Sequence, residues 1–145
     1  MAEVAAAKGV ERIEAAFAAA RAEDRAALMP YMMGGFPDPA GSDQVASAYA
    51  DGGADLIELG VPFSDPLADG PVIHAAATAA LGQGVDFEAV LGTCRHISPR
   101  LPVVLMAYTN TVLGVGPSEF AKRAVEAGAS GVIVPDLPFG EDEEV

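Results

Sequence analysis

The 145-residue sequence contains one cysteine, no tryptophan, two histidines and only eight basic residues. The single cysteine, Cys94, cannot form an internal disulfide, so nothing indicates a secreted, disulfide-bonded scaffold. Acidic residues number 21, and the formal net charge is −13. Phosphate backbones and anionic lipid surfaces repel such a chain, which argues against binding to nucleic acids or membranes. One cysteine and two histidines are also too few to predict a structural metal site.

The sequence lacks a targeting segment and a hydrophobic run of membrane-spanning length. The first 25 residues contain Glu3, Glu11, Glu14 and Glu23, whereas a signal peptide needs a basic start and an apolar core. The longest uncharged stretch, 101–118, is interrupted by proline and glycine and fits a buried strand followed by a loop. Hydrophobic residues make up 51% of the chain, which excludes disorder. We therefore expect a cytoplasmic, folded protein.

The sequence does contain a regular alternation of helical and strand patterns. A short amphipathic helix over 10–17 opens the chain. A continuous apolar run predicts a strand buried on both faces at 27–33, and further strands are predicted at 55–61, 102–108 and 131–135. Spacing and capping residues predict helices at 42–51, with Ser42 as N-cap, and at 71–81, 87–94 and 118–125.

Such alternation implies parallel strands joined by right-handed helical crossovers in an α/β fold. Two architectures fit: an open doubly wound sheet, or part of a (β/α)8 TIM barrel. A complete barrel needs about 250 residues. In the second case residues 1–145 form a partial barrel and a single domain: four strand-helix units after the amino-terminal helix, without the last helix and the carboxyl-terminal half.

The second strand-helix unit is about twenty residues longer than the units on either side of it. In α/β folds the loops after the carboxyl ends of the strands carry the chemistry, so the loop 60–71 is the candidate functional segment. Its three prolines stiffen it. No G-x-G-x-x-G or Walker-type sequence occurs, which weakens a nucleotide-binding interpretation.

Two carboxylates flank this loop. Along the strand, Glu58 alternates with an aliphatic face, so in a barrel it would point to the interior. Desolvation there would raise its pKa toward the range of a general acid or base; alternatively, it reaches water or pairs with an arginine. Asp69 could bind a substrate N–H, or it could serve the start of the next helix. Tyr31 and Tyr108 could flank a flat ligand or simply fill the core.

The stretch from Glu58 to Pro71, ELGVPFSDPLADGP, resembles the signature of the tryptophan synthase alpha chain family. Supporting matches run in the same order along the chain, at residues 30–37, 105–110 and 134–138. The resemblance implies a (β/α)8 barrel with an extra amino-terminal helix across its bottom. It also implies a lyase that cleaves indole-3-glycerol phosphate to indole and glyceraldehyde 3-phosphate in tryptophan biosynthesis, with no bound cofactor or metal.

The resemblance assigns roles to individual positions. It makes Glu58 and Asp69 the catalytic carboxylates and implies a pyridoxal-phosphate beta chain as partner in an alpha2-beta2 assembly. The other matching positions are the indole-pocket residues Tyr31, Met106 and Tyr108 and the residues near the beta-chain interface, Pro62 and Asp65.

Two departures from the family pattern qualify these expectations. Met33 stands where many relatives have Thr or Ser. The sequence also ends at Val145, before the late barrel segments that hold the substrate phosphate in the family, so the 145 residues alone are expected to have little or no activity. Two alternatives are a non-enzymatic half-barrel that oligomerises or binds a partner, and a different barrel enzyme acting on a sugar phosphate, such as an isomerase.

Overall fold

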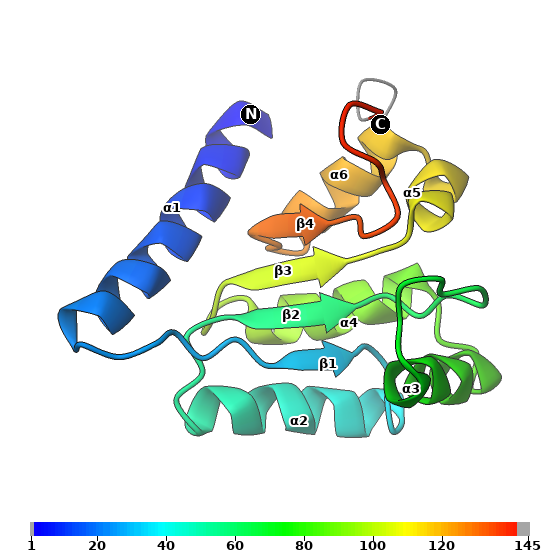
Figure 1. The fold of residues 1–145 in the computed structure, drawn as a ribbon, viewed down its shortest axis with the longest axis horizontal. Helices are drawn as coiled ribbons and strands as arrows, with labels where there is room; N and C mark the ends of the chain where they lie inside the picture. Colours follow the sequence, from blue (N-terminus) through cyan, green and yellow to red (C-terminus); the bar gives the residue numbers. More distant parts are fainter. Residues whose placement is uncertain (1, 142–145) are drawn as a thin grey trace.

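A computed structural model describes residues 2–141 and shows a parallel sheet with helices packed along it (Figure 1). The strands are β1 (Tyr31–Met33), β2 (Ile57–Gly60), β3 (Val103–Met106) and β4 (Gly131–Ile133). The helices are α1 (Ala2–Ala22), α2 (Pro39–Asp51), α3 (Pro71–Gly82), α4 (Phe87–Ile97), α5 (Thr109–Val115) and α6 (Pro117–Glu126). Within the described residues, no helix is both long and apolar enough to span a bilayer.

The four strands are parallel and follow the order β1-β2-β3-β4, as the alternation of strands and helices predicts. Their register aligns Tyr31 with Glu58 and Glu58 with Val104. Two residues further along each strand, Gly60 lies between Met33 and Met106. Because paired residues of parallel strands point to the same face, these two rows lie on one face of the sheet.

The other face of the sheet holds the main hydrophobic core. Ile57 and Leu59 of β2 and Leu105 of β3 are completely buried there. Helices α2, α4 and α6 supply the opposing apolar side chains, among them Ala46, Leu91 and Phe120. The aliphatic face predicted for the second strand is therefore confirmed, and Glu58 is on the opposite face.

Helix α1 lies at the amino-terminal ends of the strands (Figure 1). Gly9 permits a close approach: a Cβ at that position would lie 2.6 Å from the carbonyl oxygen of Ser130. Arg12 donates a hydrogen bond to the carbonyl oxygen of Ser98. The helix is longer than the predicted 10–17, and it occupies the place that the resemblance implied for an amino-terminal helix.

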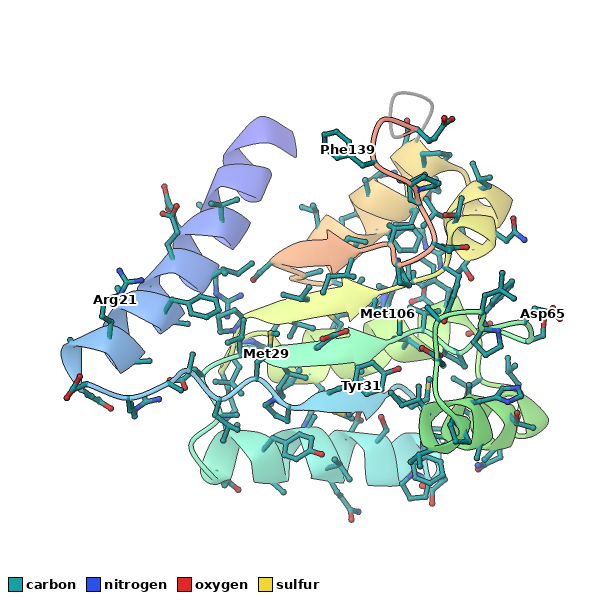
Figure 2. All side chains as sticks on the ribbon, viewed as in Figure 1. Arg21, Met29, Tyr31, Asp65, Met106 and Phe139 are labelled. Atoms are coloured by element: carbon teal, nitrogen blue, oxygen red, sulfur yellow. The ribbon has the colours of Figure 1, made fainter. Side chains whose placement is uncertain are left out.

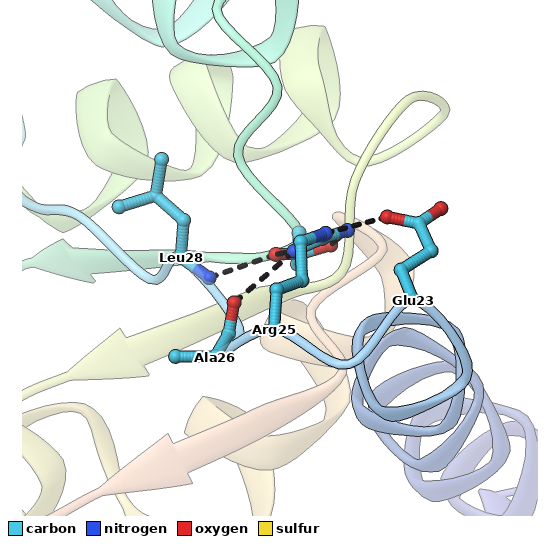
Figure 3. A network of polar contacts seen from close by, with 5 residues as sticks. Glu23, Arg25, Ala26 and Leu28 are labelled. Carbon is cyan, nitrogen blue, oxygen red and sulfur yellow. Dashed lines mark hydrogen bonds and ion pairs between the residues drawn. The ribbon is translucent and has the colours of Figure 1, made fainter.

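The segment after α1 is tied to the start of β2 by a polar network (Figure 3). The guanidinium of Arg25 donates two hydrogen bonds to the Asp55 carboxylate, at 2.7 and 2.8 Å. The backbone N–H of Leu28 donates to the same carboxylate at 2.7 Å. These bonds favour the charged form of Asp55 and lower its pKa to about 2, and the contribution of Arg25 is the largest.

The predicted strand 27–33 is wrong in its first half. Only 31–33 is a strand, and the side chains of Leu28 and Met29 are 54% and 40% exposed. The segment lies at the edge of the described sheet, where only the β2 side supplies partners. The N–H groups of Asp55 and Glu58 donate to the carbonyl oxygens of Leu28 and Pro30, and the other side stays open to solvent.

Two local predictions about helices also differ from the structure. Asp38, not Ser42, caps α2: its side chain accepts from the N–H of Gly41 at 2.8 Å. Ser42 is buried and accepts from the N–H of Gly35 at 3.0 Å. Helix α5 was not predicted; its first residue, Thr109, donates from N–H and hydroxyl to Asp136 at 2.8 and 2.9 Å.

Candidate active site

The candidate site lies at the carboxyl ends of β1, β2 and β3, where the loop 61–70 folds over the strand ends (Figure 2). The sheet alternation places Tyr31, Glu58 and Met106 on the face opposite the main core. Met106 is the last residue of β3, whereas Tyr31 is the first residue of β1 and reaches with its hydroxyl toward Gly60. In Figure 2, Asp65 lies at the outer tip of the loop.

Glu58 is half-buried. Burial raises its pKa above the ordinary range, and the negative charge of Asp69 raises it further. No basic residue contributes to that pKa, so the alternative of a strand-end glutamate paired with an arginine does not describe this position. A partly desolvated carboxyl group without a cationic partner can hold a proton closer to neutral pH.

Asp69 is half-buried at the end of the loop, just before α3. The N-cap of α3 is Gly70, and the helix start receives no hydrogen bond from a capping side chain. The carboxylate of Asp69 therefore does not cap the helix through a hydrogen bond, which was one of the two structural roles considered for it; the other was to complement the helix dipole. The charge of Asp69 acts on Glu58, Tyr31 and Tyr108, which places all four side chains in one electrostatic environment.

Tyr31 extends across the neighbouring strand toward Gly60. A Cβ on residue 60 would lie 2.1 Å from the Tyr31 hydroxyl oxygen, so glycine provides the space for the ring. Among the described residues, this buried hydroxyl has no hydrogen-bond partner. Burial and the charges of Asp69 and Glu58 raise the pKa of Tyr31, which keeps the hydroxyl protonated and able to donate.

Tyr108, which follows β3, contacts the loop 61–70 through both its ring and its hydroxyl. Its side chain is only 1% exposed. The ring stacks on Phe63, with centroids 5.4 Å apart, and the hydroxyl accepts from the N–H of Ala68 at 3.0 Å. Phe63 was not singled out from the sequence. The rings are 45 positions apart in the chain and meet only because β2 and β3 are adjacent, so no local pattern could have revealed the contact.

The remaining predicted positions are more dispersed. Met106 is buried at the end of β3, and Pro62 is buried at the start of the loop. Asp65 is exposed and accepts a hydrogen bond from the hydroxyl of Ser64 at 2.7 Å. The described part of the chain contains no group of three or more His, Cys, Asp or Glu side chains that could hold a metal ion.

A parallel sheet in sequential strand order, with an acidic pair at its carboxyl ends, defines a partial (β/α) barrel of the enzyme type. The family model of the tryptophan synthase alpha chain matches residues 17–145. The chain therefore belongs to the tryptophan synthase alpha chain family, as the 58–71 segment predicted.

Individual relatives agree with this assignment. The chain is 45% identical over 145 residues to the tryptophan synthase alpha chain of Deinococcus radiodurans, covering 99% of this chain and 53% of the relative. It is 48% identical over 125 residues to that of a Synechococcus species, covering 85% and 46%. The chain thus spans about half the length of the curated relatives it matches.

Solved structures show the same fold. A tryptophan synthase structure from M. tuberculosis superimposes with a TM-score of 0.88 at 41% identity, covering 91% of this chain and 54% of that one. Tryptophan synthase subunit alpha from Legionella pneumophila superimposes with a TM-score of 0.83 at 39% identity, covering 88% and 50%. The predicted TIM-barrel architecture is therefore confirmed, in the form of its first four strands.

Proposed function

We propose that residues 1–145 carry the acid-base half of a lyase that cleaves indole-3-glycerol phosphate into indole and glyceraldehyde 3-phosphate. The observation that supports this most is the environment of Glu58: its side chain is half-buried on the open face of the sheet, and burial, followed by the charge of Asp69, raises its pKa. Two carboxylates in unequal environments can take different roles in one reaction.

The reaction is a retro-aldol cleavage. Glu58, in its protonated form, donates a proton to C3 of the indole ring, which places positive charge on the ring nitrogen. The resulting carboxylate then removes the proton from the side-chain hydroxyl next to C3. The alkoxide collapses to the aldehyde, the carbon–carbon bond breaks, and its electrons return to the ring. Asp69, ionised, accepts the indole N–H and stabilises the positive charge.

The surrounding residues fit a flat aromatic ligand. Tyr31 and Met106 lie on the strands on either side of Glu58, on the same face of the sheet, and in this proposal they contact the indole ring together with Tyr108. The substrate phosphate is bound by segments outside residues 1–145, as the family resemblance implies. No cofactor is required for these proton transfers, and a cytoplasmic location is part of the same proposal.

The loop beyond the site faces outward. The exposed Asp65 and the neighbouring Leu67, whose side chain is almost fully exposed, form its tip. We propose that this tip, with Pro62 at its base, contacts a tryptophan synthase beta chain in an alpha2-beta2 assembly. In this proposal the beta chain covers the exposed side chain of Leu67.

Activity of site variants tests the proposal. Placed in a chain of the relatives' full length, Glu58→Gln should abolish cleavage of indole-3-glycerol phosphate while leaving its binding largely intact, because the substitution removes proton transfer but keeps the shape. The 145-residue chain should show little or no turnover. Unchanged turnover in the Glu58→Gln variant would remove Glu58 from the mechanism, and turnover by the 145-residue chain would show that the phosphate-binding segments are dispensable.

A further inference from the structure

The loop that carries Asp69 makes few hydrogen bonds with the rest of the described chain. Within the part of the chain that the structure describes, the hydrogen bonds of residues 62–69 are internal to the loop, from Ser64 to Asp65 and from Asp69 to Pro66, with a single exception. The exception is the bond from the N–H of Ala68 to the hydroxyl oxygen of Tyr108. The position of Asp69 therefore depends strongly on one side chain of β3's carboxyl-terminal extension.

Tyr108 holds the loop at two separated points. Its ring stacks on Phe63 near the start of the loop, with 24° between the ring planes. Its hydroxyl binds Ala68 at the end of the loop, one residue before Asp69. The intervening residues 64–67 bulge outward between these anchors, and Pro62 and Pro66 restrict their backbone. A rigid ring that joins both ends of the loop fixes the span between them.

The Tyr108 hydroxyl has a proton left to donate. Its oxygen accepts from Ala68, and its own O–H is free to point at an acceptor. Burial is the main cause that raises the pKa of Tyr108, and the Asp69 carboxylate is the side chain that raises it further. Protonated Tyr108 can thus accept a hydrogen bond from the Ala68 N–H and donate one to the Asp69 carboxylate.

We propose that Tyr108 is a positioning residue that holds the loop 61–70 through Phe63 and Ala68 and thereby places the Asp69 carboxylate against the substrate nitrogen. This inference rests on the proposed function for the role of Asp69, but the anchoring itself does not. This role is additional to the indole contact proposed for Tyr108 above, because it comes from the stack on Phe63 and from the almost complete burial of the ring under the loop.

Amide hydrogen exchange tests the anchoring in the chain itself. In Tyr108→Phe the stacking surface remains and the hydroxyl is lost, so the Ala68 amide should exchange about two- to tenfold faster. Phe63→Leu, which keeps the hydroxyl but weakens the stack, should also accelerate Ala68. The control Tyr49→Phe removes a hydroxyl from α2, and Ala68 should be unaffected. Leu105 in β3 should keep its protection in all three variants, which shows that the sheet is intact.

Exchange of Ala68 that is equal in the parent chain and in Tyr108→Phe would overturn the anchoring. The functional part is tested in a chain of the relatives' full length, where Tyr108→Phe should lower kcat at least fivefold with a smaller change in KM. Faster exchange with unchanged kcat would overturn the positioning role. Unchanged cleavage in Asp69→Asn would instead overturn the proposed function and leave the anchoring in place.

Discussion

At the scale of single residues, the chemistry of this chain depends on a carboxyl group kept from full solvation. Glu58 has a raised pKa because it is partly buried and because Asp69 is negatively charged. An ionised group in such a place costs folding free energy, which catalytic sites tolerate in exchange for reactivity. Ionised Glu58 should therefore lower the free energy of unfolding slightly.

This cost predicts a pH-dependent effect of Glu58→Gln. The folded-state pKa lies above the unfolded value of about 4.3, so the folded protein holds the proton more tightly. The parent chain then loses stability as the pH rises from the unfolded-state pKa of Glu58 through its higher folded-state pKa. Glu58→Gln should be more stable than the parent at pH 7, and the difference should shrink at pH 4. Urea denaturation at the two pH values measures this, and a variant less stable at pH 7 would contradict it.

Gly60 illustrates how a site residue is fixed by its neighbour. A Cβ there would meet the hydroxyl of Tyr31 at 2.1 Å. We expect Gly60→Ala to displace the Tyr31 ring, which near-ultraviolet circular dichroism can detect. Gly53→Ala is an unsuitable control because its φ is positive, whereas Gly92→Ala, with nothing within 4 Å of the added Cβ, should leave the spectrum unchanged. An unaltered spectrum in Gly60→Ala would show that the ring does not need this space.

At the scale of elements, periodicity predicted most of the fold. The alternation along β2 placed Glu58 on the face opposite the core, and the starts of α3 and α4 at Pro71 and Phe87 were as expected. Long-range polar contacts account for two of the differences. Asp136 binds the first residue of α5 from beyond β4, and Asp55 holds the chain before β1. Neither partner is near its target in the sequence.

The Asp55 network gives an element-scale prediction with the opposite pH dependence. Its lowered folded-state pKa contributes stability that is present above the unfolded value of about 3.9 and is lost as the pH falls through about 2. Asp55→Asn should lower the urea midpoint at pH 7, and the gap should close progressively below pH 4. Glu126→Gln, an equal charge change at an exposed site, is the control. A midpoint unchanged at pH 7 would contradict this prediction.

The contact between α4 and α6 supplies a test of packing. Phe120 is buried and stacks on Phe87, with ring centroids 4.6 Å apart, and Arg123 lies over the same Phe87 ring. Phe120→Ala should cost about 3–5 kcal/mol of unfolding free energy. Phe139→Ala removes the same group from a fully exposed site and should cost nothing measurable in the same denaturation experiment. Similar midpoints for the two variants would refute this assignment of the core.

At the scale of the whole molecule, two properties oppose each other. Val132 and Ile133 of the edge strand β4 are 43% and 38% exposed, and apolar edge strands favour pairing with other chains. The net charge of −13 keeps copies apart. A half-barrel that oligomerises was one alternative considered from the sequence. Its self-association would therefore depend on the salt concentration.

We expect the 145-residue chain to sediment as a smaller species at low ionic strength and to associate as added salt screens its charge. Val132→Lys, which places a charge on the edge strand, should suppress the salt-induced association. Glu126→Lys, at an exposed site outside the strand, should not suppress it. A sedimentation coefficient that is independent of salt in the parent chain would remove the edge as an association site.

The proposed chemistry requires that Asp69 lie close enough to Glu58 for its charge to raise the Glu58 pKa. Carbon-13 NMR of the Glu58 side-chain carboxyl measures this directly, through its titration in the parent chain and in Asp69→Asn. We predict a pKa above the ordinary glutamate range in the parent and a clear decrease toward that range in Asp69→Asn, since one of the two causes is removed. An ordinary pKa in the parent, or a raised one that is insensitive to Asp69→Asn, would contradict the account.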